Sequence, residues 1–120
     1  MGYLALSRRA LLDLDDIERF SVEKWGRNVA DQYLTMTEQA LELLKEQPGL
    51  LRAKPDVSES FMFYRVKHHF LVCALEDRNV YVLAVIYGSM DLPDRIAELE
   101  PSLQQEADIL HGAFLASRRR

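Results

Sequence analysis

The chain has little of several residue types, and each shortage excludes a class of protein. Its single cysteine, Cys73, rules out an intrachain disulfide, which fits a reducing cytoplasm. Four prolines and five glycines among 120 residues are too few for a disordered or collagen-like chain. No apolar run approaches the roughly 20 residues that a membrane-spanning helix needs, and the first residues turn acidic too soon for a signal peptide. We therefore expect one cytoplasmic globular domain.

Basic charge is also scarce. Fifteen Lys and Arg residues face 19 Asp and Glu residues, for a formal net charge of -4. This balance argues against a phosphate-binding surface that spans the chain, although it leaves room for a local basic patch. No phosphate-cradling glycine loop, nucleophile elbow or metal-ligand spacing is present, and adjacent histidines such as His68 and His69 make a poor metal pair on a strand. We predict no cofactor and no metal.

The segment from Phe61 to Asp91 is the most informative part of the chain. It contains three apolar runs of strand length, separated by two breaks of hairpin length. The second and third runs, residues 70–75 and 80–87, are apolar at every position. A strand with one solvated face should alternate, so both faces of this sheet need cover.

Two helices precede this segment. The first should be capped by Ser7 and end at Gly26, with Asp13, Asp16 and Arg19 on its solvent face. Its predicted apolar side comprises Ala10, Leu11, Leu14, Ile17, Val22 and Trp25. The second should run to Glu46 with a stripe at helical spacing that comprises Ala30, Tyr33, Leu34, Thr37, Ala40, Leu41 and Leu44. The short connection predicts an antiparallel helical hairpin.

The remaining segments complete an α+β order of β-α-α-β-β-β-α, with the helical hairpin packed on a small antiparallel sheet. Residues 3–6 form a first strand, and residues 50–60 are expected to be a loop. A short helix should start at Asp91 or Asp94, and Pro101 should begin a separate helix that continues to about residue 116. We expect a single domain over residues 1–120, with a core of about 3–100 and a helical extension at 101–120.

Four polar or half-polar side chains lie within the apolar strands: Tyr64, Arg65, Lys67 and Tyr87. A cation and phenols on a sheet could hold a phosphate and transfer protons in RNA cleavage. Simple strand alternation, with charges outward and tyrosine rings packed, explains the same pattern. We favour strand alternation, because it alone explains the pattern, and the phosphate-binding interpretation is the alternative.

The sequence resembles the ParE branch of the RelE/ParE toxin superfamily over roughly residues 3–100. The matching residues follow the family's order: Ser7, Ala10, Asp13, Leu14, Ile17, Trp25, Gly26, Ala30, Tyr33, Ala40, Leu44, Pro48, Phe63-Tyr64-Arg65-Val66 and Val85-Ile86-Tyr87-Gly88-Ser89-Met90-Asp91.

The resemblance implies a cytoplasmic bacterial toxin of a type II toxin–antitoxin module. ParE-like toxins inhibit DNA gyrase by protein–protein contact and are neutralised by a ParD-like antitoxin, with which we expect a heterotetramer. Operator DNA would be bound only through the antitoxin. The candidate residues for contact with target or antitoxin are Tyr64, Arg65, Tyr87, Met90 and Asp91.

RelE-like relatives instead cut mRNA on the ribosome. The family often has an Arg and a His near the end of the last strand, where this chain has residues 84–87, Ala-Val-Ile-Tyr. The loss of both groups weakens a ribonuclease interpretation, whose remaining catalytic residues would be Arg65, His69 and Tyr87. A third possibility is a non-toxic relative that only binds antitoxin.

Overall fold

The structure is a computed structural model that describes residues 2–118. Its elements follow the order β1 (Tyr3–Leu6), α1 (Arg8–Trp25), α2 (Arg27–Glu46), the 3₁₀ turn η1 (Pro48–Leu50), β2 (Arg52–Lys54), β3 (Ser58–Val66), β4 (His69–Glu76), β5 (Asn79–Tyr87) and α3 (Leu92–Ser117). The strands form one sheet in the order β1-β5-β4-β3-β2, in which β1 runs parallel to β5 and the other pairs are antiparallel. The predicted α+β class is confirmed.

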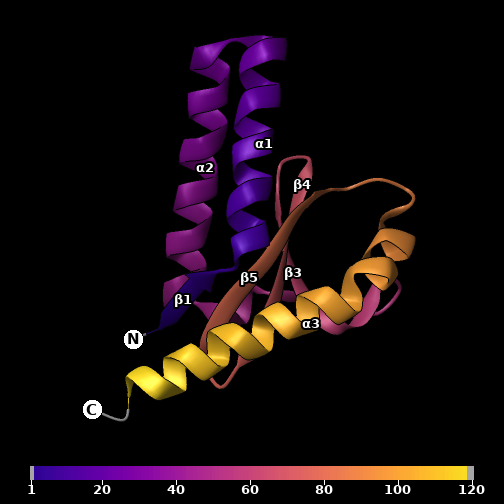
Figure 1. Ribbon diagram of the computed structural model, residues 1–120. Helices are drawn as coiled ribbons and strands as arrows, with labels where there is room; N and C mark the ends of the chain where they lie inside the picture. Colours follow the sequence, from indigo (N-terminus) through magenta and orange to yellow (C-terminus); the bar gives the residue numbers. More distant parts are fainter. Residues whose placement is uncertain (1, 119–120) are drawn as a thin grey trace.

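The helical hairpin forms where the sequence predicts it. The Ser7 hydroxyl accepts a hydrogen bond from the Ala10 N–H at 3.0 Å and so caps α1. Gly26 separates the two helices with a φ of 91°, a left-handed conformation that costs glycine nothing. In Figure 1 the hairpin α1–α2 projects well beyond the strands, so its outer turns cannot be covered by the sheet.

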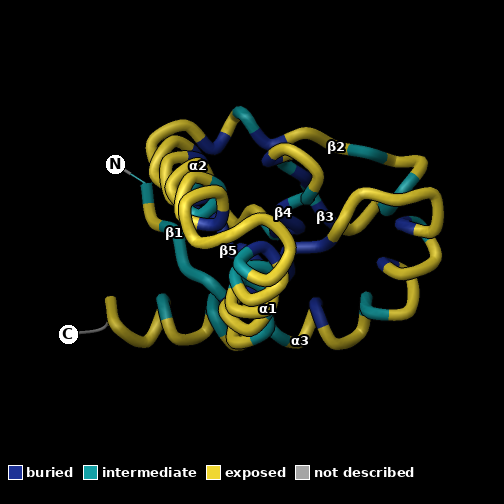
Figure 2. The backbone as a smooth tube through the Cα atoms, turned by 90° about the horizontal axis from the view of Figure 1, so that it is seen from above, coloured by how far each residue is buried: buried dark blue, intermediate teal, exposed yellow. Residues whose placement is uncertain are grey.

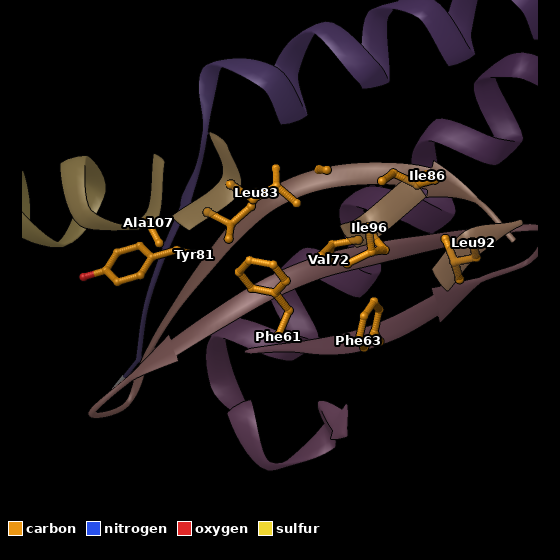
Figure 3. Close-up of a cluster of buried hydrophobic side chains, with 11 residues drawn as sticks. Phe61, Phe63, Val72, Tyr81, Leu83, Ile86, Leu92, Ile96 and Ala107 are labelled. Carbon is orange, nitrogen blue, oxygen red and sulfur yellow. The ribbon is translucent and has the colours of Figure 1, made fainter. Parts of the chain in front are cut away.

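Both faces of the sheet are covered, as the unbroken apolar runs predict. The hairpin α1–α2 packs on one face with a core cluster that includes Ala10, Leu44, Val66, Leu71, Cys73, Val80, Val82 and Val85. Helix α3 packs on the other face, where Leu92, Ile96 and Ala107 meet Phe61, Phe63, Val72, Tyr81, Leu83 and Ile86 of the strands (Figure 3). Figure 2 shows that burial is concentrated in the central strands while the helices keep exposed outer faces. The thiol of Cys73 lies in the first cluster, where burial raises its pKa, so it is an inert core group.

The apolar stripe of α1 is shifted from its predicted position. Leu11 and Trp25 are more than half exposed, whereas Ser21 is buried. The buried face instead follows Ala10 and Ser21, with half-buried apolar positions between them. Packing against the strands decides which side of the helix faces the sheet, and that side does not include every apolar residue. The stripe predicted for α2 is confirmed at its buried positions Ala30, Thr37, Ala40 and Leu44.

The C-terminal region contains one helix and not two. Helix α3 is continuous from Leu92 to Ser117 with Pro101 inside it. A proline within a helix costs about 3 kcal/mol through a lost hydrogen bond and a clash with the preceding turn. Ile96 and Leu103 are both fully buried against the sheet on either side of Pro101, and this packing keeps the two halves in one helix.

Two smaller predictions also fail. Residues 50–60 are not a loop, because β2 pairs with β3, and β3 already starts at Ser58. Main-chain pairing of a short edge strand leaves no apolar pattern to detect. Asp91 precedes α3 but does not cap it, since its carboxylate accepts a hydrogen bond from the Ser89 hydroxyl instead.

Candidate functional site

A groove of about 840 Å³ lies between the helical hairpin and the tip of the β3–β4 hairpin. It forms because α1 and α2 extend past the sheet while the β3–β4 turn reaches up beside them (Figure 1). Its walls come from both helices, from the β3–β4 turn and from the adjoining ends of β4 and β5. The lining residues are Asp16, Ile17, Phe20, Ser21, Lys24, Trp25, Val29, Tyr33, Lys67, His68, His69 and Tyr87.

The helical wall of the groove is apolar and exposed. Phe20, Trp25 and Val29 keep 55%, 53% and 44% of their surface accessible to solvent. The Phe20 and Trp25 rings meet edge to face at 5.7 Å, and the Lys24 ammonium lies within 6 Å of both ring centres. Large apolar side chains gathered in one hollow typically mark a surface that another molecule covers.

The strand wall has a polar centre made of Tyr33 and His69. The Tyr33 hydroxyl lies 2.9 Å from the Val66 carbonyl oxygen and 2.5 Å from Nδ1 of His69. When the hydroxyl donates to the carbonyl, Nδ1 must carry the hydrogen that bonds the tyrosine oxygen. The Tyr87 ring stands edge to face with His69 at 5.6 Å.

Burial sets the charge of this polar centre. It lowers the pKa of His69, with a further lowering from the neighbouring His68, and it raises the pKa of Tyr33 to about 12. At neutral pH the imidazole is therefore largely uncharged and the phenol keeps its proton. The groove thus presents an apolar wall and a neutral hydrogen-bonding centre, with Lys24 and Lys67 as its cations and Asp16, which is paired with Arg19, as its carboxylate.

The structure brings together only part of the catalytic set considered from the sequence. His69 and Tyr87 are paired directly across the β4–β5 ladder and both line the groove. Arg65 is paired with Phe70, and its guanidinium carbon lies 5.7 Å from that ring, on the α3 side of the sheet. Its Nε donates to the Lys67 carbonyl oxygen at 2.7 Å. Arg65 therefore faces away from the two groove residues.

The other candidate contact residues lie outside the groove lining. Tyr64 is half-buried and packs against the core cluster under the helical hairpin. Met90 is fully exposed at the corner that follows β5, and Asp91 is hydrogen-bonded to Ser89 beside it. Of the candidate contact residues, Tyr87 is the one that lines the groove.

Asp13 has a structural role that the sequence did not predict. It is not on the solvent face of α1, because its carboxylate accepts a hydrogen bond from the Val85 N–H at 2.9 Å. Strand β1 ends opposite Val82, so the edge of β5 beyond that point has no neighbouring strand. Asp13 replaces one missing ladder partner, and the Ser7 hydroxyl replaces another by donating to the Leu83 carbonyl oxygen at 2.7 Å. Burial raises the pKa of Asp13.

The exposed groove residues of the helices were also missed: Trp25 was assigned to the apolar side of the first helix, and Phe20 and Val29 were given no role. Helix length is a signal that could have identified them. Eighteen residues of α1 span about 27 Å, whereas only about 17 Å of β5 follow Val82, beside which α1 starts, so aromatic residues in its last turns must reach solvent or a partner.

Within residues 2–118, no three His, Cys, Asp or Glu side chains converge as a metal site would require. None of the described helices is long and apolar enough to cross a membrane.

Three comparisons with known proteins agree. The family model for the ParE toxin of the type II toxin–antitoxin system parDE matches residues 4–92, so the match ends where α3 begins. The chain is 41% identical over 51 residues to Toxin ParE1 of Caulobacter vibrioides, a match that covers 42% of this chain and about half of that relative (51%). A solved structure from the chromosomal ParDE toxin–antitoxin system of P. aeruginosa has the same fold, with a TM-score of 0.65 at 15% identity over 74% of this chain and 98% of that chain. The chain belongs to the ParE toxin family of type II toxin–antitoxin systems.

Proposed function

We propose that this chain is a cytoplasmic toxin that inhibits DNA gyrase by protein–protein contact and is neutralised by a ParD-like antitoxin. Family membership supports the toxin class, and the resemblance noted from the sequence supplies gyrase as the target. The observation that carries the proposal is the exposed apolar groove between the helical hairpin and the β3–β4 turn.

The groove fits an amphipathic segment of the antitoxin. Phe20, Trp25 and Val29 offer apolar surface that a bound segment would remove from water. Lys24 and Lys67 stand at the same walls and would favour acidic residues on the polar side of that segment. Ordering a disordered tail costs several kcal/mol, about 2–5 in coupled folding, so the tail must cover a large area that includes the groove.

Contact and not bond-making is favoured for toxicity because the candidate catalytic groups are divided between the two faces of the sheet. A ribonuclease needs a cation beside the phosphate as well as groups that accept and donate protons. Arg65 lies on the α3 side, away from His69 and Tyr87. An inhibitor that acts by binding requires no such convergence.

Purified toxin should inhibit DNA supercoiling by gyrase and cause cleaved DNA to accumulate, and equimolar antitoxin should reverse both effects. A preparation that leaves supercoiling unchanged at stoichiometric excess over gyrase would contradict the proposed target.

The antitoxin contact can be examined separately. Co-expression with the short reading frame adjacent to the toxin gene should yield a complex whose mass by light scattering equals that of a heterotetramer. The complex should bind its own operator DNA, and the toxin alone should not select that operator. A toxin that purifies without this partner would contradict the assignment of the groove.

A second candidate function, mRNA cleavage, is retained because His69 and Tyr87 lie together in the groove. The lowered pKa of His69 leaves a neutral imidazole that could accept a proton, and the Tyr87 hydroxyl could donate one. Lys67 would then be the cation at the groove in place of Arg65. Induction of the toxin would create new 5′ ends in cellular mRNA, which would be lost in Tyr87→Phe. Intact mRNA in growth-arrested cells would eliminate this candidate.

A further inference from the structure

A cationic patch lies on the opposite side of the sheet edge from the groove. Two cations lie close to one aromatic ring there: the Lys54 ammonium lies 5.4 Å and the Arg65 guanidinium carbon 5.7 Å from the centre of the Phe70 ring. Lys54 comes from β2, Arg65 from β3 and Phe70 from β4. We call these three residues the Lys54–Arg65 patch.

The ring at the centre of this patch is held in place. Phe63, which is buried, meets Phe70 edge to face at 6.2 Å. The backbone of Gly88 lies against another part of the ring, since a Cβ atom added there would come within 2.8 Å of it. Phe70 is therefore held between these neighbours and offers both cations a fixed aromatic surface.

The guanidinium of Arg65 is oriented for a ligand. Its Nε is already used by the hydrogen bond to the Lys67 carbonyl oxygen, and its guanidinium carbon lies 5.7 Å from the centre of the Phe70 ring, so two contacts restrict the group. The two terminal nitrogens remain as a fork, the geometry that recognises phosphate or carboxylate in a bidentate way. No carboxylate within residues 2–118 lies within 4 Å of either cation, although Asp56 and Glu59 follow Lys54 closely in sequence.

The chemistry of the patch favours an anion over an apolar partner. Phe70 is packed against the core under α3, with Phe63 and Gly88 against it, and both cations lie within 6 Å of its centre, so little of the ring is left on which a nucleobase or an apolar side chain could stack. A nucleic-acid strand carries one charge per 3.4 Å or so of its axis, and two cations on one small surface can contact neighbouring phosphates of such a strand. An acidic protein segment would normally add apolar anchors, and the patch offers no surface for them.

We propose that the Lys54–Arg65 patch binds the phosphodiester backbone of nucleic acid, without reading its sequence. The patch shares no residue with the groove, because it lies on the other face of the sheet. It also reconciles the net charge of -4 with contact to a polyanion, since binding needs only this local patch.

The proposal is tested by measuring the binding of the full-length chain to three labelled probes by fluorescence anisotropy. The probes are single-stranded DNA, duplex DNA and RNA, each about 20 nucleotides or base pairs long. Binding should be detected in low salt for all three probes. Two phosphate contacts predict a slope of log K against log salt of about -1.8 for duplex and about -1.4 for single strands. The charge reversals Lys54→Glu and Arg65→Glu together should weaken binding at least ten-fold.

The matched control is the pair Lys45→Glu and Arg78→Glu, which changes net charge equally at exposed positions on α2 and in the β4–β5 turn. The control pair should retain most of the binding, and thermal denaturation should show that both variants are folded. Equal weakening by the two pairs would overturn the proposal, as would the absence of binding by the wild-type chain. The proposal would also be overturned, in favour of an acidic protein partner, if a ten-residue polyglutamate displaced the probes as effectively as an unlabelled oligonucleotide of equal charge. None of these outcomes depends on gyrase, so this proposal and the proposed function can fail separately.

Discussion

Trp25 gives the sharpest quantitative prediction about the groove. Its side chain is 53% exposed, and its ring contributes a large part of the apolar wall. A tryptophan can bury up to about 250 Å², so a bound antitoxin segment could remove about 100–130 Å² of this ring from water. At about 25 cal/mol per Å², Trp25→Ala should reduce antitoxin binding by about 2–3 kcal/mol after allowance for the remaining Cβ. This corresponds to roughly a 30- to 150-fold increase in Kd.

Isothermal titration calorimetry with the antitoxin encoded beside the toxin measures this change. Ile109→Ala is the matched control, because Ile109 is 58% exposed on α3, far from the groove lining. It should change Kd less than threefold. Trp25→Ala also removes the contacts of the half of the ring that is already buried, so thermal denaturation should show a loss of about 2–3 kcal/mol, and the titrations are run at a temperature where both variants are folded. An equal loss of affinity in both variants, or a loss below threefold in Trp25→Ala, would refute the assignment of the groove to the antitoxin.

Three further predictions concern the fold that positions the site. Asp13→Ala leaves the Val85 N–H without its charged partner, so urea denaturation should show a loss of about 1.5–3 kcal/mol. Burial lowers the pKa of His69 below its ordinary value of 6.5, so the unfolded chain binds a proton more readily than the folded chain does. The free energy of unfolding should therefore decrease as the pH falls below about 6.5, and it should level off below the pKa that His69 has in the folded chain. His69→Gln should flatten this dependence. Gly88→Ala forces a Cβ to within 2.8 Å of Phe70 and should cost about 1–3 kcal/mol.

Each of these has a result that would contradict it. A Val85 amide that stays protected from hydrogen exchange in Asp13→Ala would mean that its bond to the carboxylate is dispensable. An unchanged slope of stability against pH in His69→Gln would assign that slope to other groups. For Gly88→Ala the control is Gly112→Ala within α3, where an added Cβ meets nothing, and this variant should be more stable by up to about 1 kcal/mol. Equal effects at the two glycines would remove the steric argument.

The sequence predicted the layers of the fold because these depend on period and run length. Unbroken apolar residues in β4 and β5 indicate a sheet covered on both faces, and the structure supplies the hairpin α1–α2 and α3 as the two covers. Gly26 indicates the hairpin by its position alone. The position of β1 could not be predicted, because pairing with β5 is a long-range contact that leaves no local pattern.

The groove was harder to predict, because it arises from the difference in length between the helices and the sheet. An apolar residue of α1 has the same pattern whether it lies over the sheet, as Ile17 does in part, or beyond it, as Trp25 does in the last turn. Arg65 lies on the opposite face of the sheet from His69 and Tyr87 because of strand alternation and of the register in which the strands pair. Alternation can be read from the sequence, but the register cannot.

The central claim is that the toxin inhibits gyrase by contact and without chemistry of its own. The most direct measurement is the amount of cleaved plasmid that gyrase accumulates with wild-type toxin and with Tyr87→Phe, which keeps the ring of Tyr87 but removes its hydroxyl. We expect cleaved DNA to accumulate to the same level with both proteins, and neither to create new 5′ ends in mRNA. No cleaved DNA at stoichiometric excess of wild-type toxin, together with new mRNA ends that disappear in Tyr87→Phe, would contradict the claim.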